Sequence, residues 1–229
     1  MVYVGKEGMC DETCSETELI SWVKTVSDVE LLWSRCSWIL TRQFEYDSLL
    51  SYAIKCKSIE LVEYLAKVTP DVNRQSDSYG MCSGGETSMD VAIECFNDEA
   101  VRILLVNKAN PNLLSSVQVL QHTGAPYLIK AAMLLRQTSQ KLKVKAIVSM
   151  VKHLVEAKAD INATYTFSES NESFTVLDVA VSNQCVPLTK YLLSKGGKMG
   201  LGLHAIKKMH YSTVFKPKLL SLLQSHGID

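Results

Sequence analysis

Cysteine and histidine are the residues of this 229-residue chain that could hold a metal ion or act as a nucleophile with its base. The seven cysteines and five histidines are scattered, and the close pair Cys10 and Cys14 has no second pair at a zinc-binding spacing. No phosphate-binding glycine loop and no nucleophile elbow occurs. The sequence therefore predicts no catalytic residue, metal or cofactor. A Cys–His pair that meets only in the folded chain stays open.

A run of cations is the strongest local charge signal. It comprises Arg136, Lys141, Lys143 and Lys145. Like charges on one face of a helix raise the local concentration of anions. A solvated helix face explains such a run by itself. The functional alternative, which we retain as a candidate site, is a contact site for an acidic protein, ahead of a membrane surface or a phosphate group.

The overall charge excludes one class of partner and hides an asymmetry. The chain carries 24 Lys+Arg and 24 Asp+Glu, so it lacks the basic surplus that nucleic-acid binding requires, and we expect no nucleic-acid partner. Residues 1–125 hold 10 Lys+Arg and 18 Asp+Glu, whereas residues 126–229 hold 14 and 6. If the fold is elongated, the two halves will form an electrostatic dipole.

The composition also predicts a compartment. An odd number of scattered cysteines is typical of a reducing environment with free thiols. The first residues lack the apolar core of a signal peptide, and no apolar run approaches the ~18 residues that a membrane span needs. We expect a chain without a membrane span that acts in the cytoplasm or nucleus, and delivery into a host cell stays open.

Internal similarity predicts the elements that position these residues. Three stretches align without a gap: 48–73, 87–112 and 175–200. Each has an alanine at its sixth position, then an apolar residue, then a later cluster of Leu and Val. This pattern predicts two short amphipathic helices joined by a tight turn. A fourth, stretched copy spans 126–162, with its surplus around residues 136–145.

These repeats resemble the ankyrin repeat family. The resemblance rests on residues 87–92 (TSMDVA) and 175–180 (TVLDVA), and on the repeat ends 70–73 (PDVN) and 159–162 (ADIN). It departs from the family pattern where Lys57 or Phe96 replaces the glycine of the helix turn. The resemblance covers roughly residues 45–229 and implies an all-α solenoid of stacked helix pairs. Other helical solenoids fit the repeat length but do not explain the D-x-N endings.

The repeats fill the chain as a single domain, 1–229. The predicted parts are an N-terminal helical cap (1–44), four repeats (45–86, 87–125, 126–174 and 175–200) and a C-terminal capping repeat (201–229). Two loops are longer than a repeat of about 33 residues allows. Alternating Thr and aromatic residues in 163–174 predict a β-hairpin there.

The resemblance implies a non-enzymatic module, expected to be monomeric, that binds another protein through its concave face and loops. Loop residues are the candidate contacts: Asp77, Tyr79, Met81, Tyr165 and Phe167. The aromatic residues could instead pack loop against loop. The main alternative is a regulator or carrier of an enzyme activity.

A further alternative makes the repeats themselves a substrate. Asn73 and Asn162 stand in a spacing that resembles targets of asparaginyl hydroxylation in the family. Turn formation alone also explains an asparagine at these positions.

Overall fold

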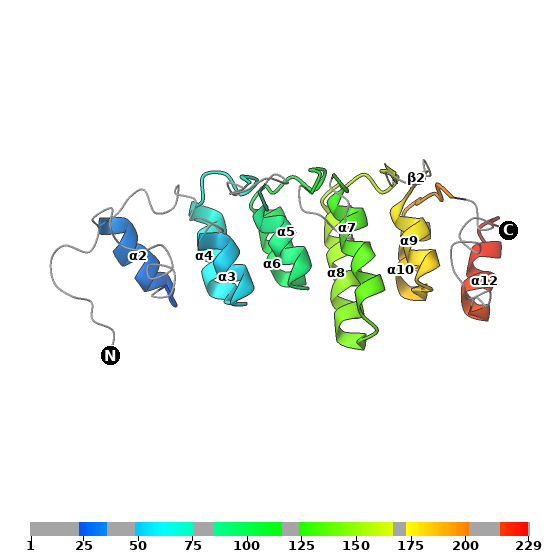
Figure 1. The fold of residues 1–229 in the computed structure, drawn as a ribbon, viewed down its shortest axis with the longest axis horizontal. Helices are drawn as coiled ribbons and strands as arrows, with labels where there is room; N and C mark the ends of the chain where they lie inside the picture. The colour runs from blue at the N-terminus through cyan, green and yellow to red at the C-terminus, as the bar shows by residue number, and fades with distance from the viewer. Residues whose placement is uncertain are drawn as a thin grey trace.

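The computed structural model describes residues 23–35, 49–75, 85–115, 124–166, 173–201 and 216–228. Helix pairs stand side by side in an elongated row, from α2 at one end to α12 at the other (Figure 1). The helices are α2 (Val26–Arg35), α3 (Leu49–Lys55), α4 (Ile59–Val68), α5 (Ser88–Glu94), α6 (Asp98–Val106), α7 (Tyr127–Met133), the 3₁₀ helix η2 (Leu134–Gln137), α8 (Lys141–Glu156), α9 (Val176–Ser182), α10 (Val186–Ser194) and α12 (Pro217–Gln224).

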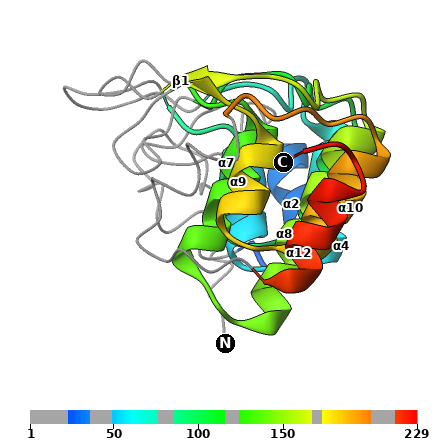
Figure 2. The ribbon, with the colours of Figure 1, turned by 90° about the vertical axis from the view of Figure 1, so that its right-hand side faces the viewer.

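The helices form two layers, visible when the row is viewed from its end, where α7 and α9 lie apart from α10 and α12 (Figure 2). The inner helices α3, α5, α7 and α9 pack in sequence on one another, as do the outer helices α4, α6, α8 and α10. Each inner helix also packs on the outer helix that follows it. A stack in which each unit contacts its neighbours is a solenoid. The predicted all-α ankyrin-repeat solenoid is confirmed.

The segments between helices lie on two edges of the row, the loop edge and the turn edge. The loop edge contains the described segments that connect one helix pair to the next: 69–75, 85–87, 107–115, 124–126, 157–166 and 173–175. The turn edge contains the segments that join the two helices of a pair: 56–58, 95–97, 138–140 and 183–185. The loop edge is the upper side of the row in Figure 1.

Local hydrogen bonds explain where inner helices begin. The Thr87 hydroxyl accepts a hydrogen bond from the Asp90 amide, and the Asp90 carboxylate accepts one from the Thr87 amide, which completes a capping box before α5. Thr175 and Asp178 form the same box before α9. Each box satisfies amide groups that have no partner inside the helix. The T-x-x-D sequence therefore fixes the helix starts.

The turns after the inner helices use left-handed backbone without glycine. Lys57 and Phe96 have φ angles of +57° and +53°, and Gln184 has +50°. Lys57 and Phe96 are the residues that replace the family's turn glycine. Left-handed backbone costs roughly 1–2 kcal/mol for a residue with a side chain. These turns are therefore formed at some expense in stability.

Small side chains allow the inner helices to approach closely. Ala53, Ala92, Ala131 and Ala180 are fully buried, at the sixth position of each repeat. Leu and Val residues of the outer helices, such as Leu104, fill the space between the layers. Close packing of this kind leaves little room for a larger group. The predicted role of these alanines matches their burial.

The β structure of the described residues is short and lies on the loop edge. β1 (Tyr165–Thr166) pairs antiparallel with β2 (Ser173–Phe174), with Tyr165 opposite Phe174. Isolated bridges join Gln75 to Thr87 and Leu114 to Pro126. The predicted hairpin in 163–174 is confirmed at its base, and residues 167–172 lie outside the described part of the chain.

The pair α7–α8 is longer than its neighbours. α8 has 16 residues, whereas α6 and α10 have nine each. The surplus around residues 136–145 forms η2, the connection to α8 and the first turn of α8. Within the described ranges, no helix combines the length and the apolar character needed to cross a bilayer.

Candidate functional site

An asparagine bridges the first two described repeats on the loop edge. The Asn73 Oδ1 atom accepts a hydrogen bond of 2.7 Å from the Asn110 amide, and its Nδ2 donates to the Lys108 carbonyl at 3.4 Å. The Asn73 amide in turn donates to the Asp71 carboxylate at 2.9 Å. The side chain therefore holds its own turn and ties it to the next repeat.

The same bridge recurs along the row. Asn112 Oδ1 accepts from the Asp160 amide at 2.8 Å, and Asn112 Nδ2 donates to the Lys158 carbonyl at 3.2 Å. Asn162 Oδ1 accepts from the Lys198 amide at 2.8 Å. This asparagine ladder gives Asn73 and Asn162 a structural role. Their hydroxylation stays a prediction.

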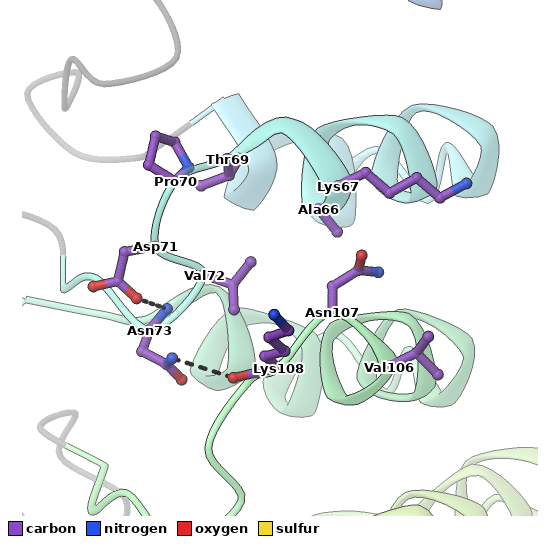
Figure 3. Close-up of a pocket in the computed structure, with 10 residues that line it drawn as sticks. All are labelled: Ala66, Lys67, Thr69, Pro70, Asp71, Val72, Asn73, Val106, Asn107 and Lys108. Carbon is purple, nitrogen blue, oxygen red and sulfur yellow. Dashed lines mark hydrogen bonds between the residues drawn. The ribbon is translucent and has the colours of Figure 1, made fainter.

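A hollow of about 310 Å³ lies beside Asn73, where α4 and α6 end (Figure 3). Its lining comprises Ala66, Lys67, Thr69, Pro70, Asp71, Val72, Asn73, Val106, Asn107 and Lys108. The lining contains neither histidine nor cysteine, and Asp71 is its one carboxylate. It therefore lacks the paired acid and base or the metal ligands that a catalytic site needs.

Tyr165 is the one predicted loop contact within the described residues. Its ring meets Phe174 edge-on, with 5.6 Å between the ring centroids, and partial burial raises the pKa of its phenol. Thr166 and Ser173 share a hydrogen bond of 2.6 Å beside it. Tyr165 is thus anchored on the hairpin base while its ring stays partly exposed. The other predicted loop contacts lie outside the described residues: Asp77, Tyr79, Met81 and Phe167.

The predicted cations come together at the turn edge. Lys141, Lys143 and Lys145 occupy the first five residues of α8, Arg136 lies in η2, and all four are exposed. The Lys143 ammonium lies 4.8 Å from the centroid of the Phe96 ring, a cation–π contact with the preceding repeat. The arrangement can attract an anionic surface.

Lys130 is a buried cation that the sequence analysis missed. Its Nζ lies 2.8 Å from Asp90 Oδ1, 2.9 Å from Glu94 Oε1 and 3.1 Å from Ser115 Oγ. The side chains of Lys130 and Asp90 are fully buried, and that of Glu94 is 38% exposed. The signal for it was a lysine inside the apolar run of residues 128–133 (LIKAAM).

The capping box of α5 belongs to this buried cluster. The Thr87 hydroxyl and the Tyr127 hydroxyl lie 2.7 Å apart, and burial raises the pKa of Tyr127. The Ser115 hydroxyl donates to Asp90 Oδ1 at 2.5 Å. Serine, lysine and aspartate in contact could in principle perform nucleophilic chemistry. Since Ser115, Lys130 and Asp90 have no exposed surface, the cluster ties α5 to α7 and offers no room for a substrate.

The buried carboxylate in the capping box of α9, that of Asp178, has backbone partners instead of a cation. Burial raises the pKa of Asp178, while hydrogen bonds from Thr175, Gly200 and Leu201 act in the opposite direction. The Gly200 amide donates to Asp178 Oδ2 at 2.8 Å. Backbone donors therefore take the place that Lys130 has at Asp90. No group of metal-binding side chains was found in the parts of the chain that the structure describes.

Comparison with known proteins gives limited matches. No family model matches the chain. Alpha-latrocrustotoxin-Lt1a of Latrodectus tredecimguttatus is 30% identical over 139 residues, which are 60% of this chain and 8% of that protein. Among solved structures, the ankyrin repeat domain of Bcl-3, a member of the IkappaB protein family, aligns over 91% of this chain and 96% of that chain, with 16% identity and a TM-score of 0.40. The fold assignment rests on the helix pairs and capping boxes described above.

Proposed function

Since the described helix pairs form an ankyrin-repeat solenoid, we propose that this chain is a non-enzymatic module that binds another protein. The observation that carries the proposal is a row of repeats tied together by the asparagine ladder, with connecting segments gathered on one edge. Contacts presented by loops on a rigid scaffold lose little conformational entropy on binding. Such a scaffold is suited to recognition.

The proposed contact surface combines the loop edge with the concave side of the inner helices. Tyr165 supplies a partly exposed aromatic ring that its contact with Phe174 holds in place. The sequence adds Tyr79, Met81 and Phe167 to the same loops. Aromatic side chains in a fixed position are frequent hot spots of protein interfaces. The turn-edge cations favour a partner with an acidic surface.

We place this activity in the cytoplasm or nucleus. Cys56, Cys95 and Cys185 are free thiols, and burial raises the pKa of Cys95 and Cys185. Free thiols agree with a reducing compartment. We expect a monomer, because a repeat row of this kind needs no second copy to complete its core.

Affinity capture with the full chain tests the proposed surface. Alanine at Tyr79, Met81, Tyr165 and Phe167 together is expected to weaken capture of the main partner by about tenfold or more, the loss of one hot spot. A matched control replaces four exposed residues of the outer layer with alanine: Lys67, Val106, Lys190 and Lys218. Because Tyr165 packs on Phe174, Tyr165→Phe serves as a variant that keeps the ring contact. Equal capture by the loop and control variants would move the site off the loop edge.

A further inference from the structure

The start of α8 extends beyond the neighbouring outer helices. The last nine residues of α8 match α6 in length, so Lys141–Ile147 are additional. Seven residues of helix add about 10 Å. We call this segment the α8 extension. In Figure 1 the α7–α8 pair reaches further than its neighbours on the side opposite the loop edge.

One side of the α8 extension is fixed on the protein. Ile147 is fully buried, Val144 packs on the core, and Lys143 covers the ring of Phe96. These contacts reach the preceding repeat, because α8 packs on α6. The extension is therefore a defined surface of the solenoid.

The other side is apolar and cationic at once. Leu142 is 79% exposed, the most exposed of the large hydrophobic residues found among the described side chains. Lys145 is four residues from Lys141 and three from Leu142, so it is a neighbour of both on the helix surface. An exposed leucine beside cations matches a partner with both carboxylates and an apolar group.

The cations of this surface are available to a partner. None of Arg136, Lys141 and Lys145 forms an ion pair within the described part of the chain. Two carboxylates of the preceding repeat are paired with other cations: Glu94 with Lys130 at 2.9 Å and Glu99 with Arg102 at 2.6 Å.

We propose that the α8 extension is a docking surface for an acidic segment of a partner protein, which covers Leu142 with an apolar side chain and places carboxylates against Lys141 and Lys145. The inference rests on the proposed function, since it gives the chemistry of a partner, but it uses a second surface away from the loop edge. Free cations speed association with an acidic partner, and the leucine retains it.

A protein segment fits this surface better than a membrane or a polyphosphate. Helices that lie on membranes present a continuous apolar face, whereas the other apolar residues here, Val144 and Ile147, are packed on the core. A phosphate chain would match the cations but leave Leu142 in water. An acidic peptide with leucines satisfies both groups.

The test uses the full chain and a labelled glutamate-rich peptide that carries leucines. Binding of this peptide is followed by fluorescence anisotropy. Three other probes are tested for binding to the same chain: the same peptide with serine for leucine, vesicles of phosphatidylcholine with phosphatidylserine, and polyphosphate. The variants are Lys141→Glu with Lys145→Glu, which leaves the Lys143–Phe96 contact intact, and Leu142→Ala. The control for the charge reversal is Lys190→Glu with Lys218→Glu, which changes the charge by the same amount. The control for Leu142→Ala is Val106→Ala, because Val106 is also a highly exposed apolar residue, with 71% of its surface exposed.

The leucine peptide should bind and the serine peptide should bind more weakly. The double charge reversal should weaken the leucine peptide by at least tenfold and Leu142→Ala by about tenfold, with both controls unchanged. Absence of peptide binding, equal loss in the control variants, or preferential binding of vesicles or polyphosphate would overturn the docking surface. The loop-edge variant of the proposed function is independent of these outcomes, so the two proposals can fail separately.

Discussion

Two lysine sites within one helix pair have opposite environments. Lys130 in α7 is fully buried and contacts two carboxylates, whereas Lys141 and Lys145 in α8 are exposed and have no described ion pair. The cluster of Lys141, Lys143 and Lys145 is the strongest local charge signal in the sequence, yet the single Lys130 has the larger role in the fold. The comparison shows that the buried charge is paired between neighbouring repeats, so removing one partner is costly, whereas the exposed charges have no ion pair among the described residues.

The largest expected effect on stability comes from removing the buried cation. Lys130→Met keeps the length of the side chain but leaves Asp90 buried without its cation, which costs about 3–5 kcal/mol in the free energy of unfolding. Urea unfolding measures the loss. Combination with Asp90→Asn should recover part of the stability, because the uncompensated charge is then gone. A loss below about 1 kcal/mol would mean that the pair is not desolvated in the native state.

A smaller loss of stability is expected when a capping threonine is replaced, and the loss should differ between the two capping boxes. Thr87→Val removes a helix cap and leaves the buried Tyr127 hydroxyl without its described partner, so we expect a loss of about 2–4 kcal/mol. Thr175→Val removes the same cap. It also removes the hydroxyl that donates to the Lys198 carbonyl, but Lys198 is an exposed residue, so water can replace this donor. Its loss should be about 0.5–2 kcal/mol.

The measurement for this pair is chemical denaturation of both variants. Adding Tyr127→Phe to Thr87→Val should recover stability, because no hydroxyl then remains unpaired. Equal losses for the two threonines would show that the contact with Tyr127 contributes nothing.

A packing substitution tests whether the two repeats share the same close contact. Ala92→Leu and Ala180→Leu each place a larger side chain where none is exposed, and each should cost about 1–3 kcal/mol through overpacking. The losses should be similar, because both alanines occupy the sixth position of a repeat. An unchanged melting temperature for either variant would mean that its helix can move away from its neighbour.

The smallest stability effect is expected at the exposed lysines. Lys141→Glu with Lys145→Glu exchanges cations for anions in the first turns of α8, where the helix dipole favours negative charge. The free energy of unfolding should change by less than about 1 kcal/mol, in the direction of a gain. Thermal melting measures it. A large loss would assign these lysines to the fold and remove them from the docking surface.

Much of the fold follows from repeated local patterns. The alanine at the sixth position and the later cluster of Leu and Val predicted the helix pairs, and the alternating Thr and aromatic residues of 163–174 predicted the hairpin whose base is formed at Tyr165 and Phe174. These features depend on neighbours in the chain, which a sequence shows directly.

The buried cluster did not follow, because it depends on a contact between repeats. Lys130 meets Asp90, 40 residues away, and Ser115 from the intervening loop. The alignment of Ala92 with Ala131 places Lys130 level with Val91, beside Asp90, so the repeat register contained the signal. The exposure of Leu142 also depends on the length of α8 relative to its neighbours, which the sequence left open.

Lysine footprinting of the full chain with its captured partner tests the central claim, that the chain binds a protein and uses exposed rather than buried charge to do so. Acetylation of lysines is compared by mass spectrometry in the free chain and in the complex. The account predicts that Lys141 and Lys145 react in the free chain and are protected in the complex, that Lys67 and Lys190 react in both, and that Lys130 reacts in neither. Protection confined to Lys67 and Lys190, with Lys141 and Lys145 equally reactive in both samples, would contradict it.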